Sequence, residues 1–211
     1  MSAQAHYQVK LTFDGPLLGT APTNPQLYTD YIVEKAVANG VDGVADEWDT
    51  MPTAEDIDRQ ARTGLTAFHR NSTGQNILYN YMLRGFFKEA CGHLWKVPGT
   101  ESSKIKAYKK RIDGWVFVNP RQVPIQLSGP VTILQRPLRA QTPQGERVAL
   151  TSSAMIPAGS TVDFRLKIVN GKEITLDLLR EWLDYGQNIG LGQWRSSSFY
   201  GTFTYEIATI A

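Results

Sequence analysis

Near its C-terminus the chain carries the stretch NIGLGQWRSSSFYG, which combines residue types that bind anions with residue types that stack on flat rings. Gly190 and Gly192 permit positive φ angles, and exposed amides in such a turn form an anion-binding nest. Arg195 supplies a planar guanidinium suited to phosphate, and Trp194 and Tyr200 offer faces on which bases stack. A plainer reading stays open, in which the glycines end a helix and the serines turn into the last strand.

A second candidate binding segment is the run KIKAYKKR, whose five bases are Lys104, Lys106, Lys109, Lys110 and Arg111. The formal net charge of +2 hides an asymmetry, since residues 1–62 carry a net charge of −6 and residues 84–147 a net charge of +8. Residues 41–58 contain seven acids and no base. Such a split creates a one-sided positive field that attracts polyanions, although two solvated faces of opposite charge explain it as well.

Catalytic motifs are sparse. The sequence lacks a G-x-S-x-G elbow, an H-E-x-x-H pair, a Walker A loop and an EF-hand loop. His69, in AFHRNSTG, is the one candidate general acid, in a loop-like setting beside Arg70, and His6 is the other histidine considered for RNA cleavage. We expect no metal site and no cofactor.

The bulk composition is that of a soluble globular protein, with 211 residues, 42% of them hydrophobic and 20% charged. Cys91 is the single cysteine, which rules out a disulfide within the chain and favours a cytosolic protein. No apolar run is long enough to span a membrane, and the N-terminal residues lack the pattern of a signal peptide. We therefore expect a cytoplasmic location.

The first half of the chain predicts a strand followed by helices. HYQVKLTF alternates apolar and polar residues, as a half-buried strand does, and a Gly- and Pro-rich loop follows it. We predict a helix over residues 25–40 and a short one over residues 54–61. Residues 74–95 predict the best long helix, with an apolar stripe made of Tyr79, Leu83, Phe86, Phe87, Ala90, Cys91 and Leu94.

The second half turns mainly to strands. GWVFVNP predicts a strand buried on both faces. Residues 131–139 and 147–156 predict a hairpin with a long loop, and residues 161–169 a clearly alternating strand. Thr175 is expected to cap a helix that ends at Gly186, and the chain closes with the alternating strand GTFTYEIATI. This order predicts an α+β fold with a split βαβ, ferredoxin-like sheet whose free face resembles that of RNA-recognition-motif domains.

The C-terminal stretch resembles the glycine-rich loop of the RAMP superfamily (repeat-associated mysterious proteins), the CRISPR-associated RNA-binding proteins. Gly190, Gly192, Arg195, Tyr200 and Gly201 match its signature in order. The preceding segments MIPAGSTVDFRLKIVNG and LDLLREWLDYG resemble the strand and helix that lead into this loop in backbone subunits of CRISPR effector complexes. The resemblance covers residues 148–211, and residues 41–58 have no counterpart in it.

The resemblance implies a single RAMP-like domain over residues 1–211 with a modified ferredoxin-like fold, in which residues 25–73 form a helical or loop insertion. It implies a non-catalytic subunit that binds single-stranded guide RNA and assembles with other copies or related subunits in a ribonucleoprotein complex for antiviral defence. The RNA would contact the glycine-rich loop and the basic run. Two alternatives stay open: a metal-independent endoribonuclease of the same superfamily, and a structural or interaction protein that reuses the fold.

Overall fold

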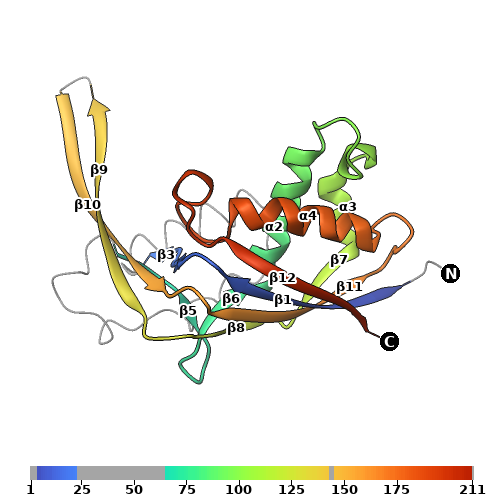
Figure 1. The fold of residues 1–211 in the computed structure, drawn as a ribbon, viewed down its shortest axis with the longest axis horizontal. Coiled ribbons are helices and arrows are strands. Elements are labelled where there is room, and N and C mark those ends of the chain that lie inside the picture. The colour runs from blue at the N-terminus through green and yellow to red at the C-terminus, as the bar shows by residue number, and fades with distance from the viewer. Residues whose placement is uncertain (1–3, 23–64, 143–144, 211) are drawn as a thin grey trace.

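The computed structural model describes residues 4–22, 65–142 and 145–210. Their strands form one sheet of seven strands and one of five, and the α-helices lie on one face of the larger sheet (Figure 1). Nearly all strand pairs are antiparallel, so the fold is of the mixed α and β kind that the sequence predicted. Within the described ranges, no helix is long and apolar enough to cross a membrane.

The larger sheet has the order β12-β1-β11-β8-β6-β5, and β7 pairs with β11 as well. Its strands are β1 (Ala5–Phe13), β5 (His69–Arg70), β6 (Asn76–Tyr79), β7 (Val116–Asn119), β8 (Gln122–Gln126), β11 (Thr161–Ile168) and β12 (Phe203–Ile210). The predicted alternation is confirmed in β1 and β11, where every second side chain is buried. Because side chains alternate between the faces of a strand, one face of each strand meets the core.

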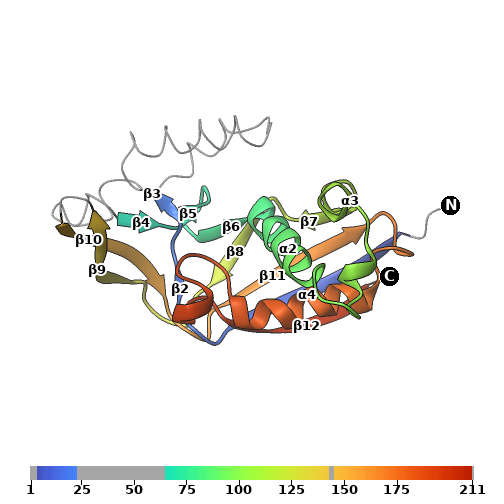
Figure 2. The same ribbon diagram turned by 90° about the horizontal axis from the view of Figure 1, so that it is seen from above.

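Three α-helices cover that buried face: α2 (Asn80–Leu94), α3 (Tyr108–Trp115) and α4 (Leu176–Ile189) (Figure 2). The predicted cap is confirmed, because the Leu178 amide donates a 3.2 Å hydrogen bond to the Thr175 hydroxyl. Gly186 does not end the helix, contrary to the prediction. It lies inside α4, where a Cβ would overlap the Phe86 ring of α2, so this glycine permits close packing of the two helices.

Two further predictions for single elements were wrong. The helix predicted to begin at residue 74 begins at Asn80, because residues 76–79 form β6 and pair with β8. Apolar runs this short fit either a strand or a helix by their periodicity. The strand in GWVFVNP is buried on one face only, since Val116 and Val118 face the core while Phe117 is 39% exposed. No described helix covers its other face.

The smaller sheet has the order β2-β10-β4-β3, and β9 pairs with β10. Its strands are β2 (Leu17–Leu18), β3 (Ala21–Pro22), β4 (Leu65–Ala67), β9 (Thr132–Thr142) and β10 (Gly145–Ile156). The predicted hairpin is present and projects away from the helices (Figure 1), but its strands pair up to Thr142 and Gly145. The long loop was a wrong prediction, because backbone pairing in a hairpin does not require apolar side chains.

Part of the predicted insertion can be placed. Residues 65–70 form β4 and β5, which pair with β10 and β6 and so belong to the two sheets. The region predicted as a loop after the first strand also contains β2 and β3. The helices predicted over residues 25–40 and 54–61, and the whole acidic run 41–58, lie outside the described residues.

Candidate functional site

The glycine-rich loop begins where α4 ends. Gly190, Gly192 and Gly201 all have positive φ, of 79°, 81° and 68°. A Cβ at Gly190 or Gly201 would overlap backbone atoms on the other side of the loop, and one at Gly192 would lie 2.7 Å from the Leu18 carbonyl oxygen of β2. Only glycine fits such positions, so these residues close the loop on itself and against the smaller sheet.

Several backbone amides of the loop donate hydrogen bonds within the chain. The Gly190 amide donates to the Gly186 carbonyl at 2.9 Å and so completes the end of α4. The Leu191 amide donates to the Gly201 carbonyl at 2.9 Å, and the Gly201 amide to the Pro16 carbonyl at 2.8 Å. The plainer interpretation of the sequence, in which the glycines end a helix, therefore accounts for Gly190. A phosphate could bind the Gly190 amide only by displacing the hydrogen bond that ends α4.

The side chains of the loop join it to two other elements, α2 and β9. Arg195 donates a 2.7 Å hydrogen bond to Glu89 of α2, and the two form an ion pair. The Arg136 guanidinium of β9 stacks over the Trp194 ring at 4.3 Å from its centroid, and the Tyr200 ring meets Trp194 edge-on at 6.4 Å. Two guanidinium groups and two aromatic rings are thus gathered where the projecting hairpin, α2 and the loop meet.

Sequence reasoning missed Arg136 of this cluster and the exposed Phe199 of the loop. Phe199 is 69% exposed and has a positive φ of 57°, an uncommon conformation for a bulky residue. The sequence offered a reason to consider Phe199, because this residue directly precedes the Tyr200–Gly201 pair of the loop. Arg136 lies in a segment that the sequence identified only as a strand, and nothing in the sequence predicts that β9 returns to the loop.

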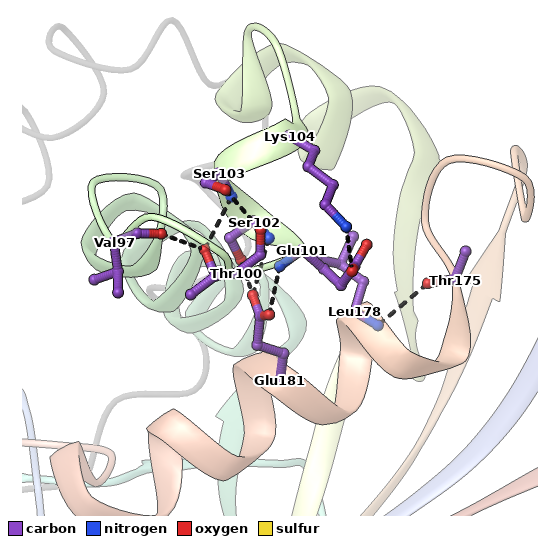
Figure 3. Close-up of polar contacts among 9 residues, drawn as sticks. All are labelled: Val97, Thr100, Glu101, Ser102, Ser103, Lys104, Thr175, Leu178 and Glu181. Atoms are coloured by element: carbon purple, nitrogen blue, oxygen red, sulfur yellow. Dashed lines mark hydrogen bonds and ion pairs between the residues drawn. The ribbon is translucent and has the colours of Figure 1, made fainter.

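The basic run is held against α4 by one carboxylate. Figure 3 shows Glu181 pointing from α4 toward the turn that precedes the run. It accepts hydrogen bonds from the Glu101 amide at 2.6 Å, the Ser102 amide at 2.9 Å and the Ser102 hydroxyl at 2.6 Å. The Trp182 indole donates to the same hydroxyl at 2.9 Å, so a buried network fixes where η4 (Ser102–Lys104) sits.

The five bases of this run are not equivalent. Lys104 forms an ion pair with Glu101, and Arg111 forms one with Glu173 and lies over the Trp115 ring at 5.3 Å. The three remaining lysines are exposed and make no ion pair with any residue that the structure describes: Lys106, Lys109 and Lys110. They are therefore the bases most available to a phosphate backbone.

The loop and the basic run lie near opposite ends of α4 (Figure 1). That helix has 14 residues, which corresponds to about 21 Å. Between the two ends, a shallow groove is lined by Leu94, Asp177, Arg180, Glu181, Asp184 and Tyr185. Its three acids and one base repel a polyanion, so the two basic groups are separate surfaces rather than one continuous patch.

The candidate general acid lies in a different setting from the one predicted. His69 is in β5 and not in a loop, it is 4% exposed, and its ring meets the Tyr79 ring edge-on at 5.0 Å. His6 lies in β1 and is half-buried. Among the residues that the structure describes, no group of three or more His, Cys, Asp or Glu side chains could hold a metal ion.

Comparison with known proteins gives a likeness of fold. No family model and no curated protein matches the sequence. Among solved structures, a chain of the cryo-EM structure of the Type III-B Cmr-beta bound to cognate target RNA matches 98% of this chain with a TM-score of 0.55 and 12% identity. The match covers 61% of that chain, so this protein spans about three fifths of its length. At this identity the likeness shows a shared fold.

Proposed function

We propose that this protein is a non-catalytic RNA-binding subunit of a CRISPR-type ribonucleoprotein complex, of the RAMP type that its C-terminal loop resembles. The observation that carries the proposal is the fold match over nearly the whole chain to part of a Type III-B Cmr-beta complex bound to target RNA. That complex contacts RNA, and a shared fold with a loop rich in guanidinium and aromatic groups supports the same class of ligand here.

The strand order supports the finer assignment of fold. In chain order, β1, α2, β7, β11, α4 and β12 follow the β-α-β-β-α-β sequence of a ferredoxin-like domain. In space these strands neighbour one another as β12-β1-β11-β7. We assign this unit as a modified ferredoxin-like fold, and the smaller sheet together with residues 25–64 as additions to a single domain.

The loop supplies the first of two proposed RNA contacts. Arg195 and Arg136 would hold phosphates, and Trp194 and Tyr200, with the exposed Phe199, would stack on bases. The loop already binds the Glu89 carboxylate through Arg195 at 2.7 Å, which supports its capacity to hold an anionic oxygen. The backbone amide of Gly192 would add a donor, as the sequence predicted.

The basic run supplies the second contact. Lys106, Lys109 and Lys110 would bind phosphates directly, while Lys104 and Arg111, which have carboxylate partners, would extend the positive field. Because the acidic groove separates this run from the loop, the RNA would pass beside α4 and not over it. Other copies or related subunits would continue the path, in the cytoplasm where the resemblance locates such complexes.

The two alternative functions receive less support. The endoribonuclease alternative names His69 and His6, of which His69 is buried against the Tyr79 ring while His6 is half-buried in β1. A purely structural protein would need neither the two guanidinium groups gathered at the loop nor the exposed Phe199 ring. We therefore propose binding without cleavage, and products from RNA hairpins incubated in the presence and absence of EDTA would overturn this proposal.

Purification followed by nucleic-acid extraction tests the proposal most directly, with a discrete co-purifying RNA as the expected result. Binding of a labelled single-stranded RNA at low salt gives the quantitative test. The triple variant Arg195→Ala, Lys109→Ala, Lys110→Ala is expected to bind at least tenfold more weakly, because it removes about three phosphate contacts. Equal affinity of the wild-type and triple-variant proteins would refute the proposed function.

A further inference from the structure

The larger sheet has a face on which none of the described helices lies. In β1, β7 and β11 the side chains that point toward the helices are buried, and those that point away form what we call the outer face. In a view from above, α2, α3 and α4 all lie on the same side of the strands (Figure 2). The outer face of this central part of the sheet is therefore open in the part of the chain that the structure describes.

The register of the strands places the outer side chains in rows. Residues directly opposite each other in an antiparallel pair point to the same side and lie about 5 Å apart. One row consists of Phe117, Lys167, His6 and Ile210, and the next of Asn119, Arg165, Gln8 and Ala208. A third row consists of Asp163, Lys10 and Glu206. The rows thus run across β7, β11, β1 and β12.

Charge is unevenly distributed along this face. The first two rows carry Lys167 and Arg165 and no acid, whereas in the third row Lys10 is flanked on both sides by an acid. Neither Arg165 nor Lys167 forms an ion pair with any described residue. The end of the sheet that contains Phe117 is therefore basic, and we call its residues Phe117, Asn119, Arg165 and Lys167 the outer basic cluster.

The chemistry of this cluster selects among possible occupants. An interface between proteins needs about 800 Å² of buried surface on each partner, with an apolar centre. Phe117 is the only large hydrophobic side chain on the described outer face that is exposed, and its neighbours are cationic or amide groups. An aromatic face beside a lysine, a guanidinium and amides is instead the combination that holds a base and its phosphates.

We propose that the outer basic cluster is a third single-stranded RNA contact, beyond the glycine-rich loop and the basic run, in which a base stacks on Phe117 and the flanking phosphates bind Arg165 and Lys167. This inference rests on the proposed function and extends it. The glycine-rich loop follows α4 on the helix side of the sheet, so the loop and the outer basic cluster lie on opposite faces (Figure 1). The protein would thus hold two separate RNA segments, and not one segment at a single site.

The test uses the full chain and a fluorescein-labelled uridine 20-mer, with affinity measured by fluorescence anisotropy over a series of salt concentrations. Phe117→Ala is expected to weaken binding about tenfold, because loss of one stacked base is worth on this order. Phe117→Tyr keeps the ring and is expected to stay within about twofold. The double variant Arg165→Ala, Lys167→Ala is expected to reduce the slope of log K against log salt by about 1.4.

Lys10→Ala is the matched control on the same face, and its affinity is expected to change less than that of the double variant Arg165→Ala, Lys167→Ala, because two acids flank Lys10. Thermal unfolding confirms that each variant is folded. A 20-mer that contains 4-thiouridine, photo-crosslinked to the wild-type protein, is expected to attach to the peptide that contains Phe117, as mapped by mass spectrometry.

Several results would overturn this inference. Unchanged affinity of Phe117→Ala, together with weaker binding of Arg195→Ala, would leave the proposed function intact and remove the contact on the outer face. A change in molar mass on light scattering for Phe117→Ala, without a change in RNA affinity, would show that a second copy of the chain covers this face. Failure of the wild-type protein to bind RNA would remove both proposals together.

Discussion

The Arg195 guanidinium and the Glu89 carboxylate lie 2.7 Å apart and tie the glycine-rich loop to the middle of α2. Each side chain is about one third exposed, so solvent and an incoming anion can reach the pair. The residue that the sequence identified as the principal phosphate ligand is therefore already bound to an acid of its own chain. RNA would have to share or displace that carboxylate.

Neutralising Glu89 is expected to strengthen RNA binding. Glu89→Gln keeps an oxygen that accepts from Arg195 but removes a negative charge next to the phosphate site. At about 4 Å, one unit charge in a water-like environment is worth about 1 kcal/mol, which corresponds to roughly fivefold in affinity. Anisotropy titration at low salt measures the change. Asp177→Asn lies near the far end of α4, beyond a Debye length of about 10 Å but beside the basic run. It is therefore used as the charge-matched control with Lys109→Ala and Lys110→Ala present in both proteins, and is then expected to have little effect. Weaker binding by Glu89→Gln would show instead that Glu89 orients Arg195.

Gly186 should not tolerate a methyl group. The Cβ of Gly186→Ala would overlap the Phe86 ring and lie 3.2 Å from Cζ of Phe203, so we expect a loss of about 1–3 kcal/mol in the free energy of unfolding. Gly85→Ala is the matched control, because Gly85 lies inside α2 with no atom within 4 Å of its added Cβ. It should stabilise the protein by about 0.5–1 kcal/mol. Urea unfolding measures the change in the free energy of unfolding for both variants. Similar changes at the two positions would contradict the packing argument.

Gly186 illustrates which features of the fold can be predicted from the sequence and which cannot. The strands β1 and β11, the Thr175 cap and the presence of a hairpin follow from local patterns, and each was predicted. The role of Gly186 depends on α2, which is about 100 residues away in the chain, and the exposure of Phe117 depends on which face the helices cover. Arg136 joins the loop only through the path of β9. Local periodicity carries no information about such distant neighbours, and so they were missed.

Removing the Glu181 carboxylate is expected to release the basic run from α4. Glu181→Ala would leave the Glu101 and Ser102 amides without the acceptor they have at 2.6 and 2.9 Å, at a cost of about 1–3 kcal/mol. Glu101→Gln breaks only the exposed ion pair with Lys104 and is expected to cost less than about 0.5 kcal/mol. Urea unfolding supplies both values. Faster hydrogen–deuterium exchange around residues 100–105 in Glu181→Ala alone would localise the effect, and equal stability of the two variants would contradict it.

Cys91 should make the stability of the protein depend on alkaline pH. Burial raises the pKa of the Cys91 thiol from 9.0 to about 11. The unfolded thiol therefore loses its proton first, and stability is expected to fall as the pH rises from about 9 to about 11, by on the order of 2 kcal/mol. Cys91→Ala lacks this contribution, so the difference in unfolding free energy between wild type and variant should narrow over the same range. A constant difference would contradict the prediction, as would rapid reaction of the native thiol with Ellman's reagent at pH 8.

Two of the three serines of the loop, Ser196 and Ser198, differ in backbone conformation. Ser196 has a positive φ of 62°, where a residue with a Cβ is strained by about 1–2 kcal/mol, and Ser198 does not. Ser196→Gly is therefore expected to stabilise the protein by about 1 kcal/mol, whereas Ser198→Gly should destabilise it slightly through the added freedom of the unfolded chain. Thermal unfolding of the two variants measures this difference in sign.

If the loop binds RNA in the conformation it has here, Ser196→Gly should also keep its RNA affinity, because a glycine readily adopts the backbone angles that Ser196 has next to Arg195. Destabilisation by both substitutions would mean that the Ser196 side chain contributes more to the loop than its backbone strain costs.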